Sequence, residues 1–313
     1  MSRPTLVTGA AGFAGSHLLD LLAGQRLDVV AWHRPGGAGP RAVDGVRWEA
    51  VELLEKTSVR EAVRSMRPSH VYHCAGAAHV GQSFSNIADT LAANVLGTHH
   101  LLDALRTAGV HARVLITGSS LVYRQSDRAL KEEDPTGPAT PYAVSKLAQE
   151  ILGQRGVRED GQHVLLTRPF NHTGPRQEPA FAAPSFAQQI ALIEKGRARP
   201  EIVVGNLDAS RDLHDVRDTV RAYTAIVERG DPGRIYNVCA GQAFKIRDVL
   251  ERLVALSKVP VTITVDTARY RPSDNLILWG DRSRIEHELG WKPVISLDRT
   301  LADLLDYWRK VLA

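Results

Sequence analysis

The sequence predicts an α/β fold, in which a doubly wound parallel sheet is followed by a smaller C-terminal α/β lobe. Three observations support this prediction. Short apolar runs alternate with helix-like stretches in the first half of the chain, a glycine-rich turn follows the first apolar run, and prolines and glycines interrupt the pattern after about residue 172. Strands that are buried on both faces read as continuous apolar runs, so the alternation indicates a parallel sheet covered by helices on both sides.

The elements of the first half follow one another in regular order. Strands are expected at 5–8, 28–32, 47–53, 70–76, 112–118 and 163–171, separated by helix-like stretches such as 16–24, 58–66 and 94–109. We therefore expect residues 1–171 to form a dinucleotide-binding domain.

Loops containing proline and glycine separate the elements of the second half. Helices are expected at 184–195, 215–229 and 246–257, and short strands at 201–204, 234–239 and 261–265. We expect residues 172–313 to form mainly a substrate-binding lobe, with a segment near 207–240 returning to the first domain.

Composition indicates an ordinary soluble globular protein of 313 residues, with 43% hydrophobic and 24% charged residues. Lys and Arg exceed Asp and Glu by 39 − 35 = 4, and no long basic block carries the excess. This mild bias favours anionic small molecules over nucleic acid as partners.

The same survey predicts a cytoplasmic protein. Cys74 and Cys239 each lie inside an apolar run, which suits buried reduced thiols better than a disulfide or a metal site. The first strand begins near Thr5, which leaves no room for a signal peptide. No apolar run approaches the roughly 18 residues of a membrane helix, and no cluster has metal-ligand spacing, so neither a membrane partner nor a metal is expected.

A glycine-rich turn joins the first expected strand to the first helix. Gly9, Gly12 and Gly15 have the spacing G-x-x-G-x-x-G directly after the strand. Glycines permit a tight turn and a close approach of the backbone to a pyrophosphate, whose charge then lies at the positive end of the helix. The placement between strand and helix favours a Rossmann-type cofactor site over an ordinary turn. We expect further cofactor contacts from Ala11, Phe13 and Ala14.

The end of the second strand bears on the choice of cofactor. Its sequence AWHRPGG contains Arg34 and no acid. An acid at this point binds the ribose hydroxyls of NAD, whereas an arginine accommodates the 2′-phosphate of NADP. The sequence thus favours NADP over NAD, with a solvated surface arginine as the alternative. The third and fourth strand ends are expected to line the cofactor through Glu52, Leu53, Cys74, Ala75 and Gly76.

Tyr142 and Lys146 form the predicted catalytic pair. Their spacing of four places both side chains on one face of a helix. A phenol with an ordinary pKa near 10 exchanges protons poorly at neutral pH, and we expect the neighbouring ammonium to lower that pKa. Two surface helix residues are the alternative reading, which the glycine turn and the hydroxyls at the end of the fifth strand disfavour.

The chain resembles the extended short-chain dehydrogenase/reductase superfamily over essentially its whole length, through Gly9, Gly12, Gly15, Ser119, Tyr142 and Lys146. The resemblance implies that Ser119 hydrogen-bonds the reacting oxygen, that Tyr142 transfers the proton and that Lys146 also holds the nicotinamide ribose. It also implies a homodimer formed by helices near 86–108 and 142–156. Further cofactor contacts are expected from Asn94, Phe170 and His172.

The C-terminal half is similar to nucleotide-sugar enzymes, most closely to the branch that acts on GDP-mannose derivatives. The similar stretches are RPFNHTGPRQ, VGNLDASRDLHDVRD, YNVCAG and RPSDN. Arginines bind pyrophosphate oxygens bidentately, although a surface salt bridge is the alternative for each arginine. The expected substrate-binding residues are Val80, Ser83, Ser120, Leu121, Asn171, Val204, Asn206, Arg211, Arg271 and Asp274.

Leu121 separates the candidate reactions. A 4,6-dehydratase requires an acid/base close to the sugar, and in the dehydratases that this chain resembles a glutamate stands at this position. Leucine carries no proton, which favours reduction over dehydration. Together with this observation, the resemblance implies an NADPH-dependent reductase of a GDP-4-keto-6-deoxyhexose that yields a product of the GDP-rhamnose type. The alternatives are a GDP-mannose 4,6-dehydratase, a nucleotide-sugar 4-epimerase and a non-catalytic nucleotide-binding protein.

The histidines leave two readings open. His79 and His172 lie on loops expected to face the pocket, where each either contacts the sugar, as a hydrogen-bond partner or a base, or makes a structural hydrogen bond. His99 and His100 lie on a helix and are expected to be structural.

Overall fold

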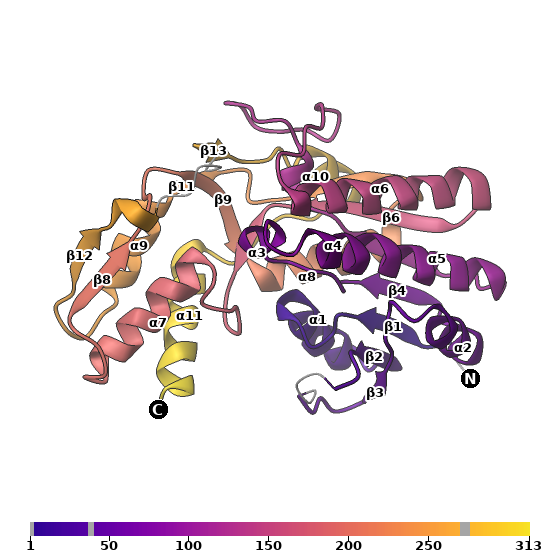
Figure 1. Ribbon diagram of the computed structural model, residues 1–313, viewed down its shortest axis with the longest axis horizontal. Helices are drawn as coiled ribbons and strands as arrows, with labels where there is room; N and C mark the ends of the chain where they lie inside the picture. The colour runs from indigo at the N-terminus through magenta and orange to yellow at the C-terminus, as the bar shows by residue number, and fades with distance from the viewer. Residues whose placement is uncertain (1–2, 37–40, 270–275) are drawn as a thin grey trace.

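The computed structural model describes residues 3–36, 41–269 and 276–313, and its larger part is built on a parallel sheet of seven strands (Figure 1). The strands lie in the order β10-β6-β5-β4-β1-β2-β3, and each neighbouring pair is parallel. They are β1 (Thr5–Thr8), β2 (Val29–His33), β3 (Val46–Ala50), β4 (His70–His73), β5 (Arg113–Thr117), β6 (His163–Pro169) and β10 (Ile235–Val238). This architecture confirms the predicted fold class.

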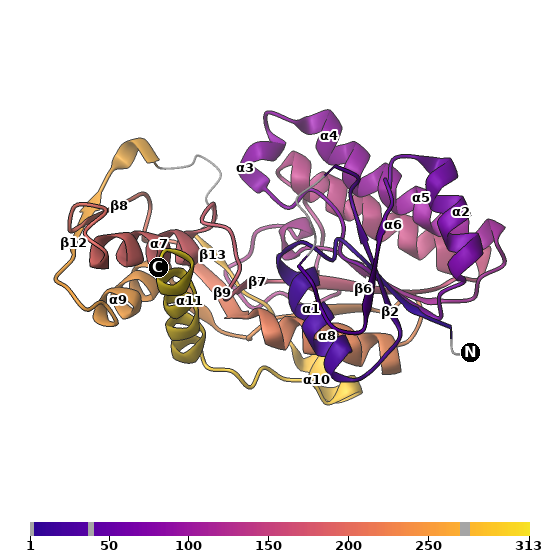
Figure 2. The ribbon, with the colours of Figure 1, turned by 90° about the horizontal axis from the view of Figure 1, so that it is seen from below.

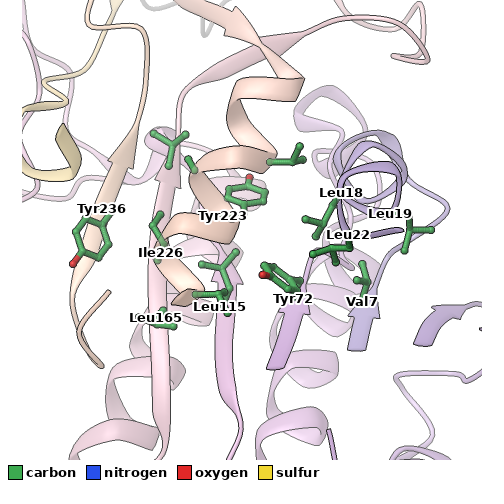
Figure 3. Close-up of a cluster of buried hydrophobic side chains, with 14 of the residues drawn as sticks. Val7, Leu18, Leu19, Leu22, Tyr72, Leu115, Leu165, Tyr223, Ile226 and Tyr236 are labelled. Atoms are coloured by element: carbon green, nitrogen blue, oxygen red, sulfur yellow. The ribbon is translucent and has the colours of Figure 1, made fainter. Parts of the chain in front are cut away.

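Helices cover both faces of this sheet. On one face lie α1 (Phe13–Gly24), α8 (Val216–Arg229) and α10 (Ser283–Leu289), and on the other α2 (Lys56–Met66), α5 (Gly97–Thr107) and α6 (Pro141–Asp160). Side chains of a strand alternate between the two faces. Val7 therefore joins the core under α1 and α8 (Figure 3), whereas Leu6 joins the core under α2 and α5.

Short helical segments connect β4 to α5. They are α3 (Val80–Ser83), α4 (Ile87–Leu91) and a π-helical segment, Ala92–Leu96, that runs directly into α5. Within the π-helical segment, Asn94 accepts a hydrogen bond from the backbone nitrogen of Ala77 at 2.8 Å and donates to the hydroxyl of Ser145 at 2.8 Å. The segment thus fixes the loop after β4 against α6.

The smaller lobe lies beside the sheet, at the left of Figure 1. Its core is formed by α7 (Ala182–Glu194), α9 (Ile246–Ala255) and α11 (Leu297–Val311), which pack with the strand pair β8 (Glu201–Val204) and β12 (Thr262–Val265). A short turn of 3₁₀ helix spans Thr267–Arg269.

A second small sheet lies between the two parts of the molecule (Figure 2). Its central strand β9 (Ser210–Asp215) pairs with β7 (Asn171–Thr173), β11 (Ala243–Lys245) and β13 (Ile277–Leu278). The expected strand 163–171 is therefore two strands, because the chain leaves the large sheet at Phe170 and pairs next with β9. The strand expected at 234–239 is β10 and forms an edge of the large sheet.

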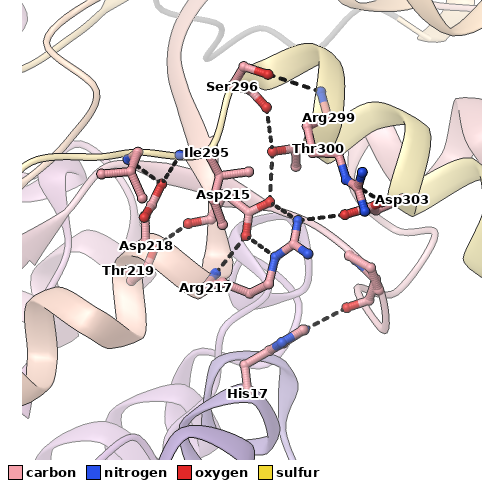
Figure 4. A network of polar contacts seen from close by, with 12 residues as sticks. His17, Asp215, Arg217, Asp218, Thr219, Ile295, Ser296, Arg299, Thr300 and Asp303 are labelled. Atoms are coloured by element: carbon pink, nitrogen blue, oxygen red, sulfur yellow. Dashed lines mark hydrogen bonds and ion pairs between the residues drawn. The ribbon is translucent and has the colours of Figure 1, made fainter.

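A buried polar network joins the lobe to the large sheet (Figure 4). Asp215 ends β9, is fully buried, and its carboxylate accepts hydrogen bonds from Arg217 at 2.7 and 2.8 Å and from the Thr300 hydroxyl of α11 at 2.7 Å. Arg217 also pairs with Asp303 of α11 at 2.8 Å. Because buried charges are stable only when paired, this network ties α11 to the start of α8.

Within the described part of the chain, no helix combines the length and apolar character that crossing a membrane requires.

Candidate active site

The glycine turn forms a close-packed cradle at the start of α1. Gly9 has φ of +66°, and a Cβ there would stand 2.5 Å from the backbone nitrogen of Ala75. A Cβ at Gly15 would stand 2.2 Å from the carbonyl oxygen of Gly9. Among the described residues no side chain caps the N-terminus of α1, so the first backbone N–H groups of the helix are available to bind an anion. The turn therefore fits a pyrophosphate.

A cavity of about 730 Å³ opens at the carboxyl ends of β1, β4, β5 and β6. Ligands of doubly wound sheets bind at this edge, and the volume suits a dinucleotide site. The predicted cofactor residues that line it are Gly9, Ala11, Gly12, Phe13, Ala14, Gly15, Arg34, Glu52, Leu53, Cys74, Ala75, Gly76, Tyr142, Lys146, Phe170 and His172. The predicted catalytic and substrate residues that line it are Ser119, Val80, Ser120, Leu121 and Asn171, in addition to Tyr142 and Lys146.

The start of α6 positions Tyr142 and Lys146. The Thr140 hydroxyl accepts from the backbone nitrogen of Ala143 at 3.1 Å, and Pro141 occupies the first turn, where its missing N–H costs nothing. Tyr142 and Lys146 then lie one turn apart, and both side chains are more than 90% buried. Ser119 follows β5 and completes the group at the same cavity wall.

The pKa of Tyr142 differs from the sequence-based prediction. The sequence predicts that Lys146 lowers the pKa of Tyr142, but burial raises that pKa above its ordinary value, and the Ser119 hydroxyl offsets only part of the rise. The Lys146 ammonium lies 5.9 Å from the centre of the Tyr142 ring and donates to the carbonyl oxygen of Thr117 at 3.0 Å. Burial lowers the pKa of Lys146 to about 8. Tyr142 is therefore a neutral phenol at pH 7, which is the form that donates a proton.

Arg34 lies at the end of β2 on the cavity wall. Within the described part of the chain it forms no ion pair, so its guanidinium is not neutralised by a carboxylate. Glu52, at the next strand end, accepts from the backbone nitrogen of Leu54 at 3.1 Å. The charge at this end of the cavity suits an added phosphate.

His172 lines the cavity beside the glycine turn. Its ring stacks on Phe13 at 5.8 Å between centres. Since a carbonyl oxygen only accepts, the contact of 3.0 Å with Phe170 requires that Nδ1 carries the proton. Burial lowers the pKa of His172 to about 4, so the ring is neutral at pH 7.

The segment 174–181 is held over the cavity from two sides. Its Arg176 pairs with Asp20 of α1 at 2.8 Å, and its Glu178 pairs with His79 at 3.1 Å. His79 also stacks on Phe181, which lines the cavity. The structure thus places the imidazole of His79 in contacts between two loops, and His79 itself does not line the cavity.

Leu121 lies in an apolar environment at the substrate end. Its side chain packs against the cluster of Tyr123, Leu130, Phe170, Cys239 and Leu278. Among the described residues that line the cavity, the carboxylates are Glu52 and Asp89, and neither belongs to the segment 119–121. The segment after β5, where a dehydratase needs an acid/base, therefore carries no carboxylate at residues 119–121.

Several predicted residues do not line the cavity. Ser83 is buried, donates to the carbonyl of Val80 at 2.7 Å and accepts from the backbone nitrogen of Tyr142 at 3.3 Å, so it supports the start of α6. Asn94 is also buried and holds the loop after β4. Val204, Asn206 and Arg211 lie on or near β8 and β9, away from the cavity wall, and Arg271 and Asp274 lie outside the described residues.

Sequence reasoning missed other residues of the cavity wall. Thr117, Gly118 and Pro169 complete the strand ends of β5 and β6, and the rule that ligands bind at such ends could have found them. Gln177, Phe181 and Tyr223 reach the wall from a loop and from α8. No local motif marks them, because tertiary packing brings them there.

Among the described residues, no group of three or more His, Cys, Asp or Glu side chains is arranged to hold a metal ion.

The chain is similar to known proteins in sequence and in structure over nearly its whole length. Residues 6–304 match the family described as GDP-mannose 4,6 dehydratase. GDP-6-deoxy-D-mannose reductase of Pseudomonas aeruginosa is 37% identical over 311 residues, which cover 98% of each chain. The solved structure of RMD from Pseudomonas aeruginosa in complex with NADPH superposes with a TM-score of 0.87 at 34% identity, over 99% of this chain and 100% of the other. A putative epimerase from Burkholderia cenocepacia superposes with a TM-score of 0.89 at 32% identity, over 99% of each chain.

Proposed function

The chain belongs to the GDP-mannose 4,6-dehydratase family, and within that family we propose that it is an NADPH-dependent reductase of a GDP-4-keto-6-deoxyhexose. The product is an alcohol of the GDP-rhamnose type. Both the relative from Pseudomonas aeruginosa, a GDP-6-deoxy-D-mannose reductase, and the solved structure with NADPH support this assignment.

The observation that carries the proposal is a proton donor, Tyr142, on a cavity wall where residue 121 is a leucine and not an acid. Ser119, Tyr142 and Lys146 meet at the cavity wall, whereas Leu121 packs into an apolar cluster where dehydration requires a carboxyl group. Reduction of a ketone needs one hydride and one proton. The described residues at this wall can supply the proton, and a bound dinucleotide would supply the hydride.

The reaction follows from the positions of these groups. The glycine turn and Lys146 would hold the dinucleotide, which would supply the hydride that reduces C4 of the sugar and leave as NADP⁺. The neutral Tyr142 phenol donates its proton to the C4 oxygen, so that the carbonyl becomes a hydroxyl. Ser119 orients the oxygen, and the Lys146 ammonium stabilises the phenolate that forms and holds the nicotinamide ribose.

Cofactor and substrate choice rest on charge. Arg34 at the end of β2, which pairs with no carboxylate among the described residues, favours the 2′-phosphate of NADP over NAD. We assign the smaller lobe to the GDP sugar. Its proposed contacts are Val80, Ser120, Leu121 and Asn171 on the cavity wall and Val204, Asn206 and Arg211 on or near β8 and β9. Arg271 and Asp274 stay predictions from the sequence, because they lie outside the described residues.

We also propose a homodimer that buries the exposed apolar face of α4, the π-helical segment and α6. On this face Ile87, Leu96, Val144 and Ile151 are 46–52% exposed, and α4 and α6 pack side by side. Exposed apolar side chains gathered on adjacent helices are typical of an interface. Ile151→Glu should convert the dimer to a monomer in analytical ultracentrifugation, whereas Val294→Glu, at a 66% exposed site elsewhere, should not. A wild-type protein that sediments as a monomer contradicts this proposal.

A cytoplasmic location accords with this chemistry. Cys74 and Cys239 are both unpaired thiols, as expected where thiols are kept reduced.

The test of function is stoichiometry. On addition of GDP-4-keto-6-deoxymannose, NADPH absorbance should fall by one equivalent for each sugar reduced. An epimerase or a dehydratase regenerates its cofactor within each turnover, so conversion of a GDP sugar without loss of NADPH contradicts the reductase assignment. A nucleotide-binding protein without catalysis gives no conversion at all.

A further inference from the structure

Tyr223 brings a second buried phenol to the cofactor cavity from the opposite helical layer. It lies on α8, is 1% exposed, and its ring packs in the core with Val7, Leu18 and Leu115 (Figure 3). Tyr142 reaches the same cavity from α6, on the other face of the sheet. Two tyrosines from opposite layers therefore converge on one crevice.

The Tyr223 hydroxyl has no hydrogen-bond partner within the described part of the chain. This hydroxyl is not fully enclosed by protein, in contrast to Trp48 Nε1 and Gln149 Oε1, which are enclosed and lack a partner. A hydroxyl that is neither enclosed nor bonded must reach a surface, and the surface that Tyr223 lines is the cavity. Buried polar groups nearly always have a partner, so this hydroxyl is directed to a ligand.

The surroundings of the phenol specify which part of a ligand it meets. Burial raises the pKa of Tyr223 well above 10. The nearby side chains of Cys74, at the end of β4, and Tyr142 raise it further. Tyr223 is therefore a neutral hydrogen-bond donor at the end of the cavity that holds the catalytic tyrosine.

We propose that Tyr223 donates a hydrogen bond to the nicotinamide half of the bound dinucleotide, from the side of the crevice opposite Tyr142. The inference rests on the proposed function, since it assumes a nicotinamide dinucleotide in this cavity. The acceptor is an oxygen of the carboxamide, the ribose or its phosphate. Tyr223 thus fixes the reduced ring while Tyr142 serves the substrate oxygen.

Tyr72 offers a matched control. It belongs to the same core cluster, is 4% exposed and has no hydrogen-bond partner for its hydroxyl within the described chain. It does not line the cavity, and in Figure 3 its oxygen is directed across the sheet, whereas that of Tyr223 is directed along the strands. Loss of either hydroxyl leaves the same apolar ring in the same core.

The experiment measures binding, by fluorescence titration of the full chain with NADPH and with 2′,5′-ADP, which lacks the nicotinamide half. Tyr223→Phe should weaken NADPH binding about 5- to 10-fold, as expected for one hydrogen bond, and leave 2′,5′-ADP binding unchanged. Tyr72→Phe should change neither.

Unchanged NADPH binding in Tyr223→Phe overturns the inference, and so does equal weakening for both ligands, which indicates a general distortion. If the wild-type protein does not bind NADPH, the proposed function itself fails. A Tyr223→Phe protein whose melting temperature falls while its NADPH affinity is unchanged also contradicts the contact.

Discussion

Tyr142 is the residue on which the proposed chemistry depends. Its phenol is buried, neutral at pH 7 and placed one helical turn from Lys146. Tyr142→Phe removes the proposed proton donor without changing the ring. We expect NADPH binding to persist and kcat to fall by about 10²- to 10⁴-fold, the usual contribution of a general acid.

Steady-state kinetics with the keto sugar and a separate NADPH titration check this prediction. Tyr307→Phe, on the distant α11, serves as the control and should leave kcat unchanged. Turnover of Tyr142→Phe at the wild-type rate would remove the proton-transfer role.

Lys146 gives the reaction a predicted dependence on pH. Burial lowers the pKa of Lys146 to about 8, with Cys74 opposing part of the shift. Reduction requires the ammonium and the neutral phenol, so kcat/KM should be constant near pH 7 and fall as the pH rises through about 8. In Lys146→Arg the guanidinium remains protonated, so the alkaline decline should move to higher pH even if the rate is lower. If kcat/KM declines at the same pH in the wild type and in Lys146→Arg, the decline arises from a group other than Lys146.

Residue identities were more predictable than residue environments. The spacing of Tyr142 and Lys146 and the position of Ser119 predicted a group of residues, and the structure brings all three to one cavity wall, because a helical turn and a strand end are local features. The direction of the Tyr142 pKa was wrong, since it depends on burial by residues distant in the sequence. Tyr223 and Phe181 were missed for the same reason.

At the scale of elements, the turn between β1 and α1 needs glycine for steric reasons. A Cβ at Gly15 would stand 2.2 Å from the carbonyl oxygen of Gly9, whereas a Cβ at Gly24, at the other end of α1, meets nothing within 4 Å. Gly15→Ala should therefore distort the turn and weaken NADPH binding at least tenfold. Gly24→Ala should bind NADPH normally and be as stable as wild type or more stable by up to about 1 kcal/mol.

Calorimetric titration with NADPH and urea unfolding of both variants check this pair. Equal affinities for NADPH in Gly15→Ala and Gly24→Ala would show that the turn does not form the cofactor cradle.

Elements of the large sheet were predictable from apolar runs, but those of the small sheet were not. β1, β2 and β5 are short apolar segments whose burial on both faces leaves a clear pattern. β9 has the sequence SRDLHD and is buried although it is largely polar. Its Asp215 accepts hydrogen bonds from Arg217, two residues further along the chain, and from Thr300 of the distant α11, and no local pattern reveals the partner on α11.

At the scale of the whole molecule, buried histidines make the fold sensitive to acid. Burial lowers the pKa of His17 to about 4, of His73 to about 3 and of His172 to about 4. The unfolded chain binds protons on these residues near pH 6.5, whereas the folded chain does not, so acid favours unfolding. The free energy of unfolding should therefore fall as the pH decreases from about 6.5 to about 4, with no contribution above that window.

Urea unfolding at pH 7, 6 and 5 measures this dependence. His17→Gln should show a shallower decline than wild type. His163→Gln, at an exposed site, should show the wild-type decline. A wild-type stability that does not change between pH 7 and 5 contradicts the assignment of neutral buried imidazoles.

The central claim is that the protein catalyses hydride transfer from NADPH to the sugar. It concerns the whole molecule, since α6, α8 and the segment 174–181 all contribute residues to the cavity wall. The most direct test uses NADPH that carries deuterium as the transferred hydrogen on C4 of the nicotinamide. It is incubated with GDP-4-keto-6-deoxymannose, and the product is analysed by NMR. The account predicts one deuterium at C4 of the sugar for each NADP⁺ formed. A converted sugar that carries no deuterium would show that the hydride came from the sugar itself, and would contradict the account.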